Sequence, residues 1–116
     1  WRCEVDYERD ALVGHLGEVV GGPVRLIPGG PEHIYSVGLV TGAAANLIPE
    51  ASRQGLDALI TGEGPHHTFH DAMEYGVNAL YAGHYATETW GVKALAAHIE
   101  ERFGIPWEFI DAPTGL

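Results

Sequence analysis

The residues best suited to chemistry by type and spacing are Glu63, His84 and Glu88. Glu63 and His84 each follow a glycine that closes a short apolar run, and the two runs, residues 55–63 and 76–84, match position for position. Glu88 comes four residues after His84, so a helical turn would bring both side chains onto one face, with Cβ atoms about 5–6 Å apart. An imidazole and a carboxylate so placed can hold a metal ion, and they suit zinc, iron or manganese. The alternative is an ordinary surface pair.

A second group of candidates lies just beyond Glu63, in the run Gly-Pro-His-His-Thr-Phe-His-Asp. Pro65 suits the first turn of a helix, which predicts that His66, His67 and His70 fall within one helical turn. His66 and His70 would then share a face as residues i and i+4. Two interpretations stay open for these imidazoles: additional metal ligands, or polar contacts at the rim of an active site.

The elements that must position these residues alternate between short apolar runs and amphipathic stretches, a pattern typical of βαβ units. Right-handed crossovers make successive strands parallel, so their carboxyl ends meet at one sheet edge, where ligands bind in such folds. We therefore predict an α/β domain of three layers, with a mostly parallel or mixed sheet of four to five strands and flanking helices. The expected strands cover 23–27, 33–42, 57–61, 78–82 and 106–110, and the expected helices cover 6–20, 47–54, 65–75 and 90–103.

Several other features are assigned structural roles. The loop 42–46 is interpreted as close packing of a helix on the sheet rather than a phosphate cradle, because no Walker lysine follows it. His33 is expected to be solvated, and His98 is expected to pack among small apolar residues of the last helix, whose apolar side chains should face inward. Gly104 should cap that helix.

The composition argues against several classes of partner. The formal charge of −10, from 16 acidic and 6 basic residues, makes nucleic acid an unexpected partner. The sequence contains neither a signal peptide nor an 18-residue apolar span, so no membrane association is expected. Cys3 is the single cysteine and cannot form an internal disulfide, which fits a cytoplasmic protein.

With Thr61-Gly62-Glu63, then His70, then Ala82-Gly83-His84-Tyr85-Ala86-Thr87-Glu88 and Gly91 in that order, the chain resembles the Nif-three-like dinuclear metal-centre family, the GTP cyclohydrolase type 2 homologues. The Gly-His-x-x-x-Glu segment is the most specific part of the resemblance, which extends to the Phe-Ile-Asp-Ala-Pro ending. The resemblance covers only the carboxyl-terminal half of a typical member. It implies that residues 1–116 are a single α/β domain and one half of a longer two-half protein.

The resemblance also implies a site and an assembly. His84 and Glu88 would be metal ligands, with Glu88 placed to bridge two divalent ions, and the intact protein would be a hexameric toroid. The remaining ligands of the family, a His-His pair before a proline and an aspartate, lie in the amino-terminal half. His66 and His67 follow a proline instead of preceding one, so that role is not transferred to them.

These features predict a metal-binding domain of a dinuclear-metal hydrolase acting on a phosphoester or a purine ring, with half of the metal site on this chain. Glu63 or His70 would orient the attacking water or a small-molecule substrate, whose identity the sequence does not specify. The alternative is a metal-binding or oligomeric assembly module without catalysis. A chain with two protein ligands should bind metal weakly, because water fills the other coordination positions.

Overall fold

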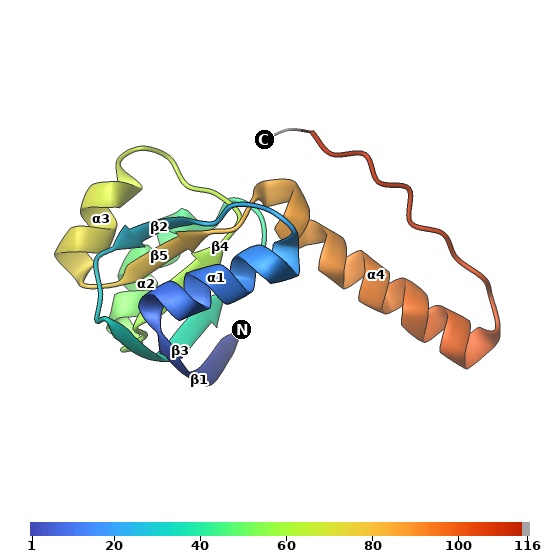
Figure 1. Cartoon of the computed structure of the whole chain (residues 1–116), viewed down its shortest axis with the longest axis horizontal. Helices are drawn as coiled ribbons and strands as arrows, with labels where there is room; N and C mark the ends of the chain where they lie inside the picture. The colour runs from blue at the N-terminus through green and yellow to red at the C-terminus, as the bar shows by residue number, and fades with distance from the viewer. Residues whose placement is uncertain (115–116) are drawn as a thin grey trace.

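The computed structural model describes residues 1–114 of the 116-residue chain. Its elements form the βα alternation that the sequence predicts, with one additional strand at the amino-terminal end (Figure 1). In chain order they are β1 (Arg2–Glu8), α1 (Arg9–Val20), β2 (Arg25–Pro28), β3 (His33–Leu39), a 3₁₀ turn (Ala45–Leu47), α2 (Ile48–Arg53), β4 (Ala58–Thr61), α3 (Thr68–Tyr75), β5 (Asn78–Tyr81) and α4 (His84–Phe103).

The five strands form one mixed sheet in the order β1-β3-β4-β5-β2. The central strands β3, β4 and β5 are parallel, and the edge strands β1 and β2 pair with them antiparallel. In the centre Ile60 of β4 is opposite Leu80 of β5, so the two matched apolar runs lie side by side and end at the same edge. This arrangement confirms the predicted α/β class and the predicted convergence of strand ends.

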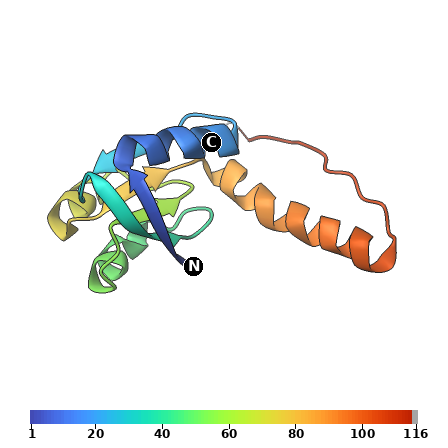
Figure 2. The ribbon, with the colours of Figure 1, turned by 60° about the horizontal axis from the view of Figure 1, so that its bottom comes forward.

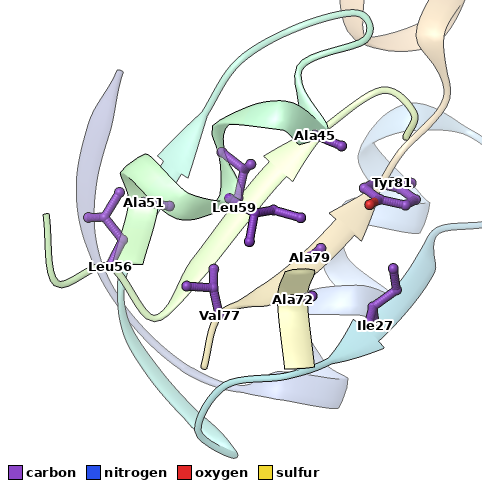
Figure 3. Close-up of a cluster of buried hydrophobic side chains, with 10 residues drawn as sticks. Ile27, Ala45, Ala51, Leu56, Leu59, Ala72, Val77, Ala79 and Tyr81 are labelled. Atoms are coloured by element: carbon purple, nitrogen blue, oxygen red, sulfur yellow. The ribbon is translucent and has the colours of Figure 1, made fainter. Parts of the chain in front are cut away.

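Helices cover both faces of the sheet, which makes the three layers expected from the sequence (Figure 2). Because side chains alternate along a strand, neighbouring residues of β4 and β5 belong to different cores. One core joins the sheet to α1 and contains Leu12, Ile34, Val37, Ala58, Ile60 and Leu80. The other joins it to α2 and α3 and contains Ile27, Ala45, Ile48, Ala51, Leu56, Leu59, Ala72, Val77, Ala79 and Tyr81 (Figure 3).

Helix α4 differs from the other helices because it projects away from the sheet (Figure 1). Of its 20 residues, all of them described, Thr89 alone is buried. The predicted inward packing is therefore wrong for this chain: Leu95 is 59% exposed and Phe103 is 68% exposed. His98 is likewise exposed instead of packed among apolar residues. Gly104 ends the helix in the left-handed conformation, as predicted.

Two other expected elements need correction. The helix predicted over 6–20 begins only at Arg9, because the preceding residues alternate between apolar and acidic side chains and pair as β1 along β3. The strand predicted over 106–110 is an exposed extended segment, which has no strand partner within residues 1–114. Side-chain contacts with α4 hold it: Trp107 donates to Glu100 at 2.9 Å, and the Lys93 ammonium lies 4.1 Å from the Phe109 ring centroid.

In the described part of the chain, none of the helices is long and apolar enough to cross a membrane.

Candidate metal-binding site

The candidate site is built from the loops that follow three parallel strands. Gly42 follows β3, Gly62 and Glu63 follow β4, and Gly83 precedes the first residue of α4. Backbone hydrogen bonds join the loops, because the Gly62 amide donates to the Gly42 carbonyl at 2.8 Å and the Gly83 amide donates to the Gly62 carbonyl at 2.9 Å. The three loops therefore lie side by side at the carboxyl edge of the sheet.

His84 occupies the centre of this edge, with one carboxylate at each ring nitrogen. Its Nδ1 lies 2.7 Å from Oε1 of Glu63, and its Nε2 lies 3.4 Å from Oε1 of Glu88. Helix α4 begins at His84, so His84 and Glu88 are residues i and i+4 of its first turns, as the sequence predicts. All three side chains are at least one-third exposed and thus accessible to ligands from solvent.

The two carboxylates change the protonation of the imidazole. The hydrogen bond with Glu63 raises the pKa of His84 above its ordinary value of 6.5, and the charge of Glu88 adds to this effect, while partial desolvation opposes it. The ring therefore holds its proton more firmly than a free histidine does. When one nitrogen loses its proton, Glu63 favours the tautomer with hydrogen on Nδ1 and a free lone pair on Nε2.

A space for a ligand beside Nε2 depends on Gly42. This glycine has φ +69°, and a Cβ on it would lie 2.7 Å from Oε1 of Glu88 and 3.3 Å from Nε2 of His84. Any side chain here would fill the space that both donor atoms face. The backbone of Gly42 is fixed by Thr87, whose hydroxyl accepts from the Gly42 amide at 3.1 Å, and by buried Thr61, whose hydroxyl donates to the Gly42 carbonyl at 2.9 Å.

Gly42 and Thr87 also belong to the candidate site, and the sequence interpretation gave neither of them a place in it. The Gly42 loop was expected to serve helix packing alone, yet it forms the wall of the site. The signal was present in the repeated Thr-Gly at the ends of β3 and β4, residues 41–42 and 61–62, which places a second glycine at the same sheet edge.

The remaining candidate histidines do not join this cluster. His66 and His67 lie in the turn before α3, and His70 lies in its first turn, so His66 and His70 do not share a helix face as predicted. All three are exposed; the His70 ring packs edge-on against Phe69, and His67 lies 4.0 Å from Asp71. Within residues 1–114, no group of three or more His, Cys, Asp or Glu side chains is arranged to hold a metal ion by itself.

The fold and the edge cluster define an α/β domain that presents one histidine and two carboxylates where parallel strands end. The chain belongs to the Duf34/NIF3 (NGG1p interacting factor 3) family, whose sequence model matches residues 2–114. This match confirms the resemblance noted from the sequence.

Curated relatives agree with this assignment. The GTP cyclohydrolase 1 type 2 homolog of Deinococcus radiodurans is 57% identical over 88 residues, which are 76% of this chain and 34% of that protein. The Archaeoglobus fulgidus protein of the same name is 37% identical over 109 residues, 94% of this chain and 44% of that protein. The chain thus spans between a third and a half of these relatives.

The fold also matches solved structures. The crystal structure of TTHA1606 from Thermus thermophilus is similar over the whole of this chain and 45% of its own, with a TM-score of 0.85 and 43% identity. The protein ybgI, whose function is described as unknown, has a TM-score of 0.88 and 33% identity over 95% of this chain and 45% of its own.

Proposed function

We propose that this chain supplies half of a divalent-metal site, with Nε2 of His84 and the carboxylate of Glu88 as its ligands, and that the site serves a hydrolase. The observation that carries the proposal is the pair of carboxylates at the two nitrogens of His84, at 2.7 and 3.4 Å. One carboxylate would hold the ring and the other would share the ion.

The donor atoms and their surroundings fit such an ion. A neutral imidazole with a carboxylate suits zinc, iron or manganese better than magnesium, which prefers all-oxygen coordination. The space beside both donors depends on the absent Cβ of Gly42. Two protein ligands are fewer than the three of a typical catalytic zinc site, so further ligands must come from outside this pair.

Glu63 acts through His84 in this account. By accepting a hydrogen bond from Nδ1, Glu63 fixes the orientation of the ring and makes Nε2 a stronger donor to a metal ion. A carboxylate at this place is a usual partner of a metal-bound histidine. The sequence predicts that Glu63 orients the attacking water or the substrate, whereas its hydrogen bond to Nδ1 supports a role in holding the His84 ring. Among the described side chains, no hydrogen bond or ion pair joins His70 to His84, Glu63 or Glu88, so we propose no role for it at the metal.

A pair of bound metal ions supplies an activated water and positive charge for the group under attack. On this chain, His84 and Glu88 at the edge of the sheet would hold the ions, with Glu88 common to both by family resemblance. By family resemblance the remaining ligands belong to the amino-terminal half, and the intact protein is a homo-oligomer, with a hexamer expected. The curated relatives carry the name GTP cyclohydrolase 1 type 2 homolog, which makes phosphoester or purine-ring hydrolysis the reaction class to test.

The test is zinc affinity and turnover in four proteins: wild type, His84→Ala, Glu88→Ala and the control His98→Ala, which removes an exposed imidazole from the same helix. We expect this chain alone to bind zinc weakly, with each site substitution lowering affinity at least about tenfold and the control leaving it unchanged. Turnover should be measured on the intact protein. Unchanged zinc affinity in both site variants would refute the metal site, and turnover that survives when His84→Ala and Glu88→Ala are combined in one protein would refute the hydrolase.

A second candidate function is an assembly module that binds metal without catalysis. The observation in its favour is the exposed apolar surface of α4 and the following segment, including Trp90, Val92, Leu95, Phe103 and Ile110. Surfaces of this kind mark protein interfaces. Bound metal with no turnover on phosphoester and purine substrates in the intact protein would favour this function.

A further inference from the structure

A small pocket lies between β2, the loop after β4 and the start of α3, next to the loop that carries Glu63. Its volume is about 160 Å³. Arg25, Ile27, Gly64, Pro65, His66, Thr68, Phe69 and Tyr81 line it. In a chain with 16 acidic residues, this lining contains an arginine and a histidine but no carboxylate. The local charge is therefore opposite in sign to that of the chain as a whole.

Arg25 is free to bind a ligand at this place. It pairs with Tyr81 across the β2 and β5 strands, so both side chains stand on the same face of the sheet as Ile27. Figure 3 shows the Tyr81 ring at the end of β5, with Ile27 on the neighbouring strand. The arginine ion pairs found within residues 1–114 involve Arg2 and Arg53, and Arg25 is exposed.

Hydrogen bonds within the chain hold the floor of the pocket. The buried Thr68 hydroxyl donates to the Pro65 carbonyl at 2.5 Å, so in its 2.6 Å contact with Tyr81 the phenol must be the donor. Both hydroxyl protons are thereby used inside the wall. Gly64 lies directly on this ring, since a Cβ there would be 2.6 Å from the Tyr81 hydroxyl. Arg25 and His66 are therefore the two side chains left in the pocket to bind an anion.

The pocket and the metal-binding site share a loop. Gly64 lines the pocket, and the preceding residue, Glu63, bonds His84. Tyr81 lies two residues before Gly83, the residue that precedes the first residue of α4. A molecule held at Arg25 would therefore extend along the same strand ends toward His84.

We infer that this pocket binds the terminal phosphate of a phosphomonoester, whose remaining part extends over the exposed Phe69 ring and toward the metal-binding site. The volume of the pocket indicates which class of ligand it binds. At 160 Å³ it is smaller than the ~300–1,000 Å³ of sites that enclose a whole drug-sized ligand, but it is large enough for one compact anionic group. An arginine fork matches phosphate oxygens in geometry and charge. The substrate assignment rests on the proposed function, whereas anion binding does not.

The experiment titrates inorganic phosphate, and separately phenyl phosphate, into chelator-treated protein at constant ionic strength while backbone amide NMR shifts are recorded. We expect saturable shifts at Gly64, His66, Phe69 and Tyr81, with phenyl phosphate bound at least as tightly as inorganic phosphate. Arg25→Gln should weaken binding about tenfold, and His66→Gln should weaken it less. Arg102→Gln, which removes an exposed arginine from the end of α4, is the matched control and should change nothing.

Each contrary outcome has a definite meaning. Absence of saturable shifts, or wild-type affinity in both Arg25→Gln and His66→Gln, overturns the inference. An equal loss in Arg102→Gln also overturns it, because binding would then follow net charge. Weaker binding of phenyl phosphate than of inorganic phosphate rejects the monoester. Because metal is removed, phosphate binding that persists alongside a failed zinc titration refutes the metal site alone.

Discussion

Two regions of this molecule use apolar residues in opposite ways. The body, residues 2–82, packs most of its large apolar side chains into or against two cores on either side of the sheet. The arm, residues 84–114, contains a similar proportion of large apolar residues but exposes most of them. The body is thus stabilised by its own contacts, while the arm presents a surface. The candidate metal site lies at the junction, where the first turn of the arm is held by loops of the body.

The largest expected contrast between the regions is in stability. Leu80→Ala in β5 removes a fully buried side chain from the core against α1, which should lower the free energy of unfolding by about 2–5 kcal/mol. Leu95→Ala makes the same chemical change on the exposed face of α4 and should alter it by no more than about 0.5 kcal/mol. Urea denaturation of both variants measures the difference. Equal losses would show that the arm is packed in solution.

At the junction, Glu63→Gln should weaken zinc binding by about 10–100-fold, because a neutral amide holds the Nδ1 proton of His84 less well than a carboxylate. Glu74→Gln, which neutralises an exposed carboxylate on α3, controls for net charge and should leave the affinity unchanged. Calorimetric titration gives both values. If the two variants lose affinity equally, the effect is long-range charge and not support of the ring.

The glycine that forms the wall of the site allows a sharper comparison. Gly42→Ala and Gly55→Ala both place a Cβ on a residue with positive φ, which should destabilise each protein by about 1–2 kcal/mol. At Gly55 the added atom meets open space, whereas at Gly42 it meets Glu88 and His84. Zinc affinity should therefore fall in Gly42→Ala alone. Equal affinities for zinc would mean that the space beside the two donors is not used.

The smallest expected effect is within the body, where His33 of β3 bridges two carboxylates of β1. Its Nδ1 lies 2.9 Å from Glu8 and its Nε2 lies 2.6 Å from Asp6. These hydrogen bonds, that of Glu8 first, raise the pKa of His33 above its ordinary value. Its contribution to stability is therefore complete below about pH 6.5 and lost as pH rises through the raised pKa.

Urea midpoints of wild type and His33→Gln, measured at pH 6 and pH 8.5, isolate this contribution. The wild type should lose more stability than the variant between the two pH values, while His84, present in both, contributes equally. A difference between the proteins that is independent of pH would show that the bridge is not ionic. The sequence interpretation placed this histidine in solvent because it could not show that β1 lies beside it.

The parts that the sequence predicted are those with local signals. The matched runs 55–63 and 76–84 predicted two parallel strands and the meeting of Glu63 with His84 at their ends, and the i, i+4 spacing predicted the face shared with Glu88. Other features depended on tertiary contacts. The alternation of β1 was masked by an assumed helix start, and the inward face of α4 was inferred from periodicity, which shows that a face is apolar but not what covers it.

The role of Gly42 in the wall of the site also could not be predicted from local sequence. Whether Gly42 serves packing or a ligand depends on its distance from Glu88, which lies far from it in the sequence. The same holds for Arg25 and Tyr81, which meet only because β2 pairs antiparallel with β5.

The most direct test of the metal site is a crystal structure of the zinc-soaked protein with anomalous diffraction recorded at the zinc edge. The account predicts a peak within bonding distance of Nε2 of His84 and a carboxylate oxygen of Glu88, with Glu63 still hydrogen-bonded to Nδ1. A peak at Nδ1 between His84 and Glu63, or zinc held at His66, His67 or His70 with the space beside Gly42 empty, would contradict it.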